Sequence, residues 1–390
     1  MDYFVLKDYK KEEPKKLNKK KVVKMTLIMF GFAIVVLLAS MYIGNSEFRG
    51  WTDKYILGKE ITENTGAIIN IDSESNPYIY AYDRFIVVLN RNHLQSYGGG
   101  GSKESDIELT ITNPLFASNG RYLCVAEKGG NKIYLISGEH ILWQKDLEGE
   151  ISQISVNRNG YVSVSHKSMV KLYNNDGKEL ATAHLSSTYP IDTAVSNDNS
   201  ELAIAEINYS GNLLQSNIKI ISVDKTVSDP DNAVIYTYKS EKKNIITKIY
   251  YQDGNTLMCM LDNGIVKRVG DESSEETKFD TNTLFADINL NGHTVEVKKI
   301  QSGLFSAEAQ IEIKPVGRAN PNVYMTNFIP KDINVYDSMI AINAGTEVDF
   351  INTNGWLIKK YTSTRNIKDV VMCGSVAGIV YKDKIEIVNF

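Results

Sequence analysis

The chain has 390 residues, of which 43% are hydrophobic and 23% charged, and its formal net charge is −4. It is too long for one small domain, and its hydrophobic fraction is ordinary for a globular protein with a sizeable core. Its acidic balance argues against nucleic-acid binding, because neutralising phosphates requires a basic face.

The first element is an apolar run near the N-terminus. Residues 25–43, "MTLIMFGFAIVVLLASMYI", contain no charge over nineteen positions, about what a helix needs to cross a roughly 30 Å hydrocarbon layer. Residues 1–24 carry nine Lys against four acidic residues, a net charge of +5, which leaves −9 for the rest of the chain. By the positive-inside tendency, we expect a cytoplasmic basic tail (1–24), a transmembrane helix (25–43), a juxtamembrane segment (44–60) and an extracellular domain (61–390).

The alternative is a cleaved signal peptide. A 24-residue leader is long, the apolar run exceeds a usual signal-peptide core, and no pair of small residues closes it, since Ala39 is followed two positions later by Met41. The first cysteine is Cys124, so a lipoprotein anchor is also absent. We therefore expect an uncleaved signal-anchor at the cell membrane.

Beyond this segment the chain consists of short runs rich in Val, Ile, Tyr and Leu, separated by Asn-Gly, Asp-Gly and Asn-Asp turns. This pattern predicts an all-β domain. The clearest turns recur at spacings of about 40 residues, with one longer interval that holds a polar insertion. They are Asn119-Gly120, Asn159-Gly160, Asp198-Asn199 and Asp253-Gly254, with weaker members at Asp83, Asn291-Gly292, Asp337 and Gly374.

One repeat shows its internal layout in full. Residues 151–185 contain four strand-like segments, "ISQISV", "YVSVSH", "MVKLYN" and "KELATAHL". The turn before the last segment contains Asp176-Gly177, which suits the positive φ angles of a tight hairpin. Four short strands in each repeat of about 40 residues predict a β-propeller.

The phrases "NNDGKEL", "ISGEHILWQKDL" and "INTNGWLIKKY" resemble the quinoprotein-like and WD40-like propeller repeats, in which a glycine turn leads into an outer strand. Eight blades are expected, with seven as the alternative. The last repeat ends at Phe390 after three strands, so a fourth must come from the N-terminal side, either "KYILGKEI" (54–61) or "GAIINI" (66–71).

The residues that could carry chemistry are scattered. Cys124, Cys259 and Cys373 each lie among apolar neighbours, which predicts buried free thiols. The acidic turns at Asp72 and Asp229 lack the order of a calcium loop, and "GGGGSKES" (98–105) lacks the ending of a phosphate loop and would link two strands. The five histidines, which form no recognisable motif, are His93, His140, His166, His184 and His293. We therefore assign no residue to catalysis, to a cofactor or to a metal.

The whole-chain arrangement of a basic tail, one apolar helix and a propeller resembles the single-pass propeller proteins of Firmicutes that contain a domain of unknown function. The resemblance implies an extracytoplasmic binding or scaffold module of the cell envelope whose partner is a protein or a glycan. The alternatives are an envelope enzyme, either a hydrolase or quinoprotein-like, with its site in the axial channel, and a ligand sensor.

These functions predict different surfaces. An enzyme needs convergent acidic, His or Arg side chains along the axis, whereas an interaction module needs an exposed apolar or aromatic patch. The first strand of each repeat lines the channel of a propeller, so its polar residues are the candidates for a channel site. They include Ser152, Asp192 and Lys248.

Overall fold

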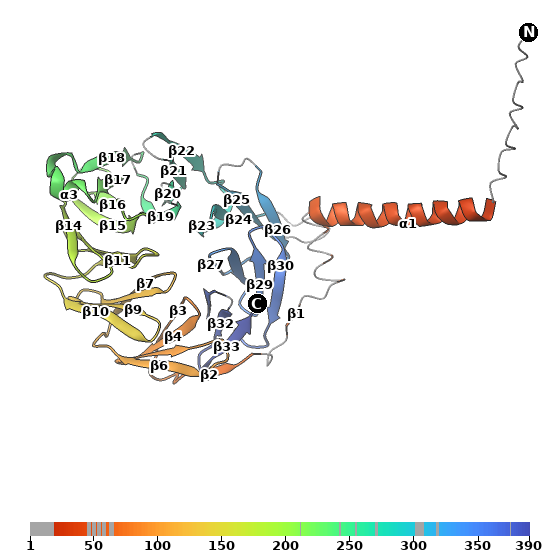
Figure 1. Ribbon diagram of the computed structural model, residues 1–390, viewed down its shortest axis with the longest axis horizontal. Helices are drawn as coiled ribbons and strands as arrows, with labels where there is room; N and C mark the ends of the chain where they lie inside the picture. The colour runs from red at the N-terminus through yellow and green to blue at the C-terminus, as the bar shows by residue number, and fades with distance from the viewer. Residues whose placement is uncertain are drawn as a thin grey trace, which may run out of the picture.

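The computed structural model describes residues 19–390 apart from 45–47, 49–51, 53–55, 57–59, 62–65, 211, 242, 254–255, 270–271, 301–307, 317–319 and 375. Most of the expected basic tail and juxtamembrane segment, and Gly254 of one predicted turn, lie outside this description. A 26-residue helix, α1 (Lys19–Gly44), precedes the domain and projects away from it (Figure 1). Its most apolar stretch is Val23–Tyr42, with a mean hydropathy of 2.2, and none of this stretch is buried inside the protein. Tyr42, at its end, lies against Trp356 of blade 7 with ring centroids 6.4 Å apart.

Eight β-sheets form a ring around a central channel (Figure 1), which confirms the eight-bladed β-propeller. Blades 1 to 4 are β3–β6 (Tyr78–Tyr82, Phe85–Asn90, His93–Tyr97, Lys103–Glu108), β7–β10 (Pro114–Asn119, Tyr122–Glu127, Lys132–Ser137, His140–Asp146), β11–β14 (Gln153–Val156, Val162–Ser165, Met169–Tyr173, Glu179–His184) and β15–β18 (Thr188–Val195, Glu201–Asn208, Gln215–Ser222, Val234–Lys239). Blades 5 and 6 are β19–β22 (Ile246–Asp253, Thr256–Leu261, Gly264–Val269, Glu272–Lys278) and β23–β26 (Thr283–Leu290, His293–Lys299, Ala309–Pro315, Asn322–Thr326).

The last two blades receive strands from the N-terminal side. Blade 7 contains β27–β30 (Asp332–Tyr336, Met339–Asn343, Glu347–Asn352, Leu357–Thr362), and β1 (Glu60–Ile61) adds to it in parallel with β30. Blade 8 contains β31–β33 (Asp369–Cys373, Val376–Val380, Lys384–Asn389), and β2 (Ile68–Asn70) supplies its fourth strand antiparallel to β33. The segment 66–71 therefore closes the ring as predicted, whereas the alternative donor contributes only β1, on the neighbouring blade.

The core of the molecule lies between the blades, because each sheet buries both faces against its neighbours. Every pair of adjacent blades shares one cluster of buried apolar side chains; between blades 2 and 3, for example, Cys124, Leu135 and Trp143 pack against Ile154 and Val164. The remaining interfaces are built in the same way. All three cysteines are free and buried in these clusters, as predicted.

The hairpins follow the turn chemistry of the sequence. In each blade the first strand lies next to the channel, and we call the turn that joins it to the second strand the inner turn. Asn119 pairs with Tyr122 across the inner turn of blade 2, where Gly120 has a φ of +52°. Asp83 and Asp337 occupy the corresponding position in blades 1 and 7 with φ of +51° and +53°, a conformation that Asp, Asn and Gly tolerate best.

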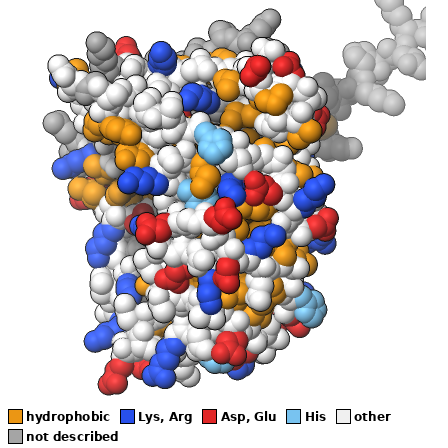
Figure 2. Space-filling view, turned by 90° about the vertical axis from the view of Figure 1, so that its left-hand side faces the viewer, with side chains coloured by type: hydrophobic (Ala, Val, Ile, Leu, Met, Phe, Trp, Pro, Cys, Tyr) orange, Lys and Arg blue, Asp and Glu red, His pale blue; other side chains and the backbone are white. Residues whose placement is uncertain are grey.

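Small elements interrupt the regular pattern. The polar insertion of blade 4 folds into a short helix α3 (Lys225–Ser228) and a 3₁₀ turn η1 (Pro230–Asn232) between β17 and β18. The glycine-rich segment 98–105 links two strands, as predicted: residues 98–102 join β5 to β6, and residues 103–105 begin β6. Figure 2 shows that Lys, Arg, Asp and Glu side chains are interspersed over the outer wall on this side of the ring, with apolar groups between them.

Candidate functional site

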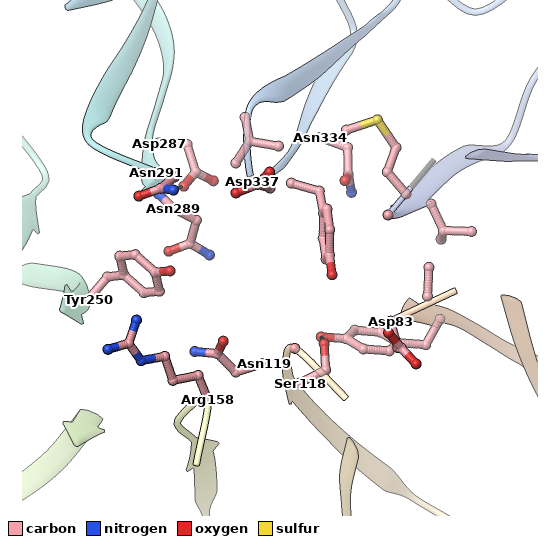
Figure 3. Close-up of a pocket in the computed structure, with 18 of the residues that line it drawn as sticks. Asp83, Ser118, Asn119, Arg158, Tyr250, Asp287, Asn289, Asn291, Asn334 and Asp337 are labelled. Carbon is pink, nitrogen blue, oxygen red and sulfur yellow. Dashed lines mark hydrogen bonds between the residues drawn. The ribbon is translucent and has the colours of Figure 1, made fainter. Parts of the chain in front are cut away.

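The channel contains a cavity of about 680 Å³ at the end where the inner strands meet their inner turns. Side chains from several blades surround it and point toward its centre (Figure 3). Because the eight inner strands run side by side in the same direction, their last residues converge here. The propeller geometry therefore gathers residues that are far apart in the sequence.

The cavity has two walls of different character. Blades 2 to 6 contribute the polar wall, and blades 7, 8 and 1 contribute a wall that is largely aromatic and aliphatic. The polar wall includes Ser118, Asn119, Arg158, Asn197, Lys248, Gln252, Asp287, Asn289 and Asn291. The second wall includes Tyr80, Ile333, Val335, Tyr336, Val371 and Met372, with Asp83, Asn334 and Asp337 among them.

One ion pair lies within the polar wall. The Lys248 ammonium is 3.1 Å from both carboxylate oxygens of Asp287, so it joins β19 of blade 5 to β23 of blade 6. Asp287 also accepts a hydrogen bond from the backbone N–H of Asn289 at 2.8 Å. These contacts leave Asp287 well supplied with donors and little available to a ligand.

Other lining side chains have no such partner. Among the described residues, Asp83, Asn119, Arg158, Asn291 and Asn334 make no side-chain hydrogen bond or ion pair. In Figure 3 the Arg158 guanidinium lies near Asn119 on one side of the cavity, and Asn291 and Asp337 lie on the other. An unpaired polar group that faces a cavity must be solvated by water or bound by a ligand, because leaving it unsatisfied costs about 1–3 kcal/mol.

Two buried oxygens on the polar wall also lack a donor. The side-chain oxygens of Gln252 and Asn289 have no hydrogen-bond partner in the described structure. The Gln252 amide nitrogen, in contrast, donates to the backbone oxygens of Ile288 and His293 at 3.2 and 2.8 Å.

Three tyrosines line the cavity: the Tyr80 hydroxyl pairs with the Ser118 hydroxyl at 3.2 Å, and the other two are Tyr250 and Tyr336. Burial raises the pKa of Tyr250, and the nearby carboxylates of Asp337 and Asp287 act in the same direction while Arg158 opposes them. Burial also raises the pKa of Tyr336 to about 12. Both phenols are therefore neutral at physiological pH and can donate a hydrogen bond.

The three predicted channel residues do not form one site. Lys248 lines the cavity, but its ammonium is paired with Asp287. Asp192 lies on inner strand β15, and its carboxylate accepts hydrogen bonds from the backbone N–H groups of Thr193 and Ile249, both at 2.9 Å, instead of lining the cavity. Its hydrogen bond with Ile249 joins inner strand β15 to inner strand β19. Burial of this carboxyl raises its pKa.

Ser152 lies at the far end of its blade. It precedes β11, and its hydroxyl donates to the backbone oxygen of Ser165 at 3.0 Å. Of the three predicted channel residues, Lys248 is the one that lines the cavity. Among the residues that the sequence did not single out, Arg158 lies just beyond the end of β11, whereas Tyr250 and Asn334 lie within β19 and β27.

The other candidates raised from the sequence lie outside the cavity. His166 is buried and its Nδ1 contacts the Glu150 backbone oxygen at 3.1 Å, while His93 pairs with Asp106 at the surface. Asp72 caps its own turn by accepting from the backbone N–H of Glu74. Among the described residues, no group of three or more His, Cys, Asp or Glu side chains is arranged to hold a metal ion.

An exposed aromatic patch lies at the opposite end of blade 4. Tyr189 and Tyr209 stack with ring centroids 4.6 Å apart, and Leu213 and Leu214 are each nearly half exposed beside them in the chain. Asn208, next to Tyr209, pairs with Thr188 at the start of β15, so the patch is at the far end of the blade from its inner turn. The molecule thus has both a polar axial cavity and a separate apolar patch.

Residues 61–390 match the family model DUF5711, a family of unknown function, and the chain belongs to that family. A comparison with curated protein sequences gave no match.

Several solved structures share the fold. BamB from Moraxella catarrhalis aligns over 83% of this chain and 98% of its own, with 10% identity and a TM-score of 0.50. The C-terminal WD40 domain of Sif2 aligns over 83% and 99%, with 10% identity and a TM-score of 0.54. Chaetomium thermophilum Sqt1, solved bound to the N-terminus of ribosomal protein L10, aligns over 85% and 100%, with 9% identity and a TM-score of 0.54. At these identities the likeness concerns the fold.

Proposed function

We propose that the protein is a membrane-anchored extracytoplasmic binding module of the bacterial cell envelope, and that its axial cavity holds a protein or glycan partner. The observation that carries the proposal is the set of partnerless polar side chains around a cavity of about 680 Å³. Such a volume lies within the roughly 300–1,000 Å³ range of ligand sites. Convergent unsatisfied groups in a concave site are what a binding module requires.

The anchor and its orientation follow from the N-terminal segment. The apolar stretch Val23–Tyr42 is long enough to span a bilayer, and none of it is buried inside the protein. The excess of lysine before it favours a cytoplasmic N-terminus and an external propeller. This arrangement supports a cell-envelope location and agrees with the resemblance to anchored propeller proteins of Firmicutes.

Binding is favoured over catalysis by the chemistry of the lining. The cavity is lined by neither His nor Cys among the described residues, and Ser118 shares its hydrogen bond with the Tyr80 hydroxyl at 3.2 Å instead of with a base. A nucleophilic mechanism needs an activating base within hydrogen-bond reach. The Lys248 and Asp287 side chains neutralise one another, which suits a structural pair better than an acid or a base.

The test is to fill the cavity and measure retention of the partner. Asn334 points into the cavity (Figure 3), so an Asn334→Trp variant of the full-length chain should occupy it. The matched control is Asn92→Trp, at an exposed turn that does not line the cavity. We expect affinity purification from native envelopes to recover a reproducible partner with the parent and the control, and to lose it with Asn334→Trp.

Two results would contradict the proposal. Equal recovery by Asn334→Trp would place the partner elsewhere on the surface. Turnover of a small molecule by the purified protein, without any retained partner, would instead favour the enzyme.

A further inference from the structure

The free groups of the cavity define what a ligand must offer. Asp83 and Asp337 present carboxylates, the latter with one long hydrogen bond of 3.5 Å from the Ser338 hydroxyl, and Arg158 presents a guanidinium without a partner among the described residues. A ligand that satisfies all of them must donate several hydrogen bonds and accept at least one.

This requirement separates the common ligand classes. A phosphate or carboxylate only accepts, so it would suit Arg158 but would be repelled by Asp83 and Asp337. An ammonium only donates, so it would suit the carboxylates but would be repelled by Arg158. A hydroxyl group does both, and it carries no charge that either set of residues would repel.

The second wall adds a shape requirement. Tyr80 and Tyr336, with Val335 and Met372, present an aromatic and aliphatic surface opposite the amides of the polar wall, and the Asp83 and Asp337 carboxylates lie beside these tyrosines. A pyranose ring matches this division, because its faces carry C–H groups while its rim carries hydroxyls. Burying apolar ring faces against such a wall contributes affinity, and the polar wall fixes the orientation.

We propose that the axial cavity binds an uncharged, hydroxyl-rich saccharide segment, with its ring faces against the tyrosine wall and its hydroxyls on Arg158, Tyr250 and the Asp83 and Asp337 carboxylates. This inference rests on the proposed function and specifies its ligand. The neutral Tyr250 phenol, which has no internal hydrogen bond in the described residues, donates to a ligand oxygen. A protein partner in the same cavity is the competing outcome.

The experiment uses the full-length chain in lipid nanodiscs, because sugar-based detergents would occupy a saccharide site. The neutral probes are cellobiose, maltose and N,N′-diacetylchitobiose, and the charged probes are glucose 6-phosphate and the glucosamine dimer. Binding is measured by titration calorimetry and by saturation-transfer NMR. We expect at least one neutral disaccharide to bind and both charged probes to bind at least tenfold more weakly.

Two matched pairs of variants locate the site. Arg158→Ala and Tyr250→Phe should each weaken binding by about tenfold, the loss expected for one hydrogen bond to a ligand. Arg84→Ala and Tyr78→Phe should leave it unchanged, because neither residue lines the cavity. Unchanged thermal unfolding midpoints establish that all four variants remain folded.

The outcomes separate this inference from the proposed function. If no saccharide binds while envelope purification still recovers a protein through the cavity, the saccharide inference is wrong and the binding function stands. Preference for a charged probe, or binding unaffected by both cavity variants, also overturns the inference. If neither saccharide nor protein is retained, both proposals fail.

Discussion

Ile69 of β2 is the cross-strand partner of Ile385 of β33, although the two residues come from opposite ends of the propeller domain. Both side chains are buried in the cluster between blades 8 and 1, together with Ile86 and Val88. The backbone bond from Ile387 N–H to the Ala67 oxygen, 2.9 Å long, continues the pairing. A single short strand thus fastens the ring and covers the edge that β33 would otherwise expose.

The first prediction concerns this closing strand. Replacing Ile69, which is 3% exposed, by Ala should lower the free energy of unfolding by about 2–5 kcal/mol, because a buried cavity replaces the side chain. Its neighbour Ile68 is 43% exposed and points to the other face of the strand, so Ile68→Ala should change stability by about 0.5 kcal/mol or less. Denaturant unfolding of the two variants measures the difference. Equal effects would mean that β2 is not the closing strand.

A second prediction removes the partner strand. Deleting residues 384–390 eliminates β33, leaves β2 unpaired and removes the Phe390 ring that lies 4.9 Å from Phe350. We expect the propeller to lose cooperative unfolding, since blades 7, 8 and 1 all lose contacts. Calorimetry checks this; a truncated protein that melted cooperatively at the parent temperature would show that closure is dispensable.

A third prediction concerns pH. Burial lowers the pKa of His166 below its ordinary value of 6.5, and its buried Nε2 has no acceptor among the described residues. The contact of its Nδ1 with the Glu150 backbone oxygen acts in the opposite direction and does not overcome burial. Lys171 disfavours the imidazolium further, and Glu179 partly offsets this effect.

The sign follows from linkage. Below pH 6.5 His166 is protonated in the unfolded chain but is still neutral in the folded chain. Protonation therefore favours the unfolded state, and the free energy of unfolding falls as the pH falls from about 6.5 toward the folded pKa of His166. Replacing His166 by Gln should flatten the stability profile between pH 7 and 5, whereas the exposed His140→Gln should not. NMR titration of the imidazole signals checks the pKa itself, and a His166 signal that titrates at or above 6.5 would refute the explanation.

A fourth prediction tests the orientation of the anchor. The native thiols are 0–1% exposed, and burial raises the pKa of Cys373 to about 12, so they should resist maleimides. Glu139→Cys places a thiol at the exposed turn between β9 and β10, and Lys10→Cys places one in the basic tail. A membrane-impermeant maleimide should label intact cells through position 139 alone and should label position 10 only after permeabilisation. The reverse pattern would invert the topology.

The sequence predicted the ring better than the cavity, and the reason is physical. Turn residues such as Asn119-Gly120 indicate each hairpin locally, because few amino acids readily adopt the positive φ that a tight turn requires. Counting strands predicted that a segment from the N-terminal side closes the ring, and the structure shows that residues 66–71, rather than 54–61, supply it. The cavity depends instead on how eight inner strands are staggered, which no local pattern encodes.

The turn residues themselves illustrate this limit. The sequence marked Asp83, Asn291 and Asp337 as turn residues of the repeat. In the folded ring, these residues also supply polar groups to the cavity. Asp192 appeared to be a channel residue because of its strand, but its carboxylate points along the ring to the backbone of Ile249. Strand membership was predictable from the sequence, whereas side-chain direction required the structure.

If the partner binds in the axial cavity, site-specific photocrosslinking in native envelopes should capture it there. A photoreactive residue at Asn291 or Asn334 reports on the cavity, and one at Tyr209 or Leu142 reports on exposed surface outside it. We predict reproducible adducts from Asn291 and Asn334 and none from Tyr209 or Leu142. Adducts confined to Tyr209, beside the exposed leucines of blade 4, would contradict the account and assign the binding surface to that patch.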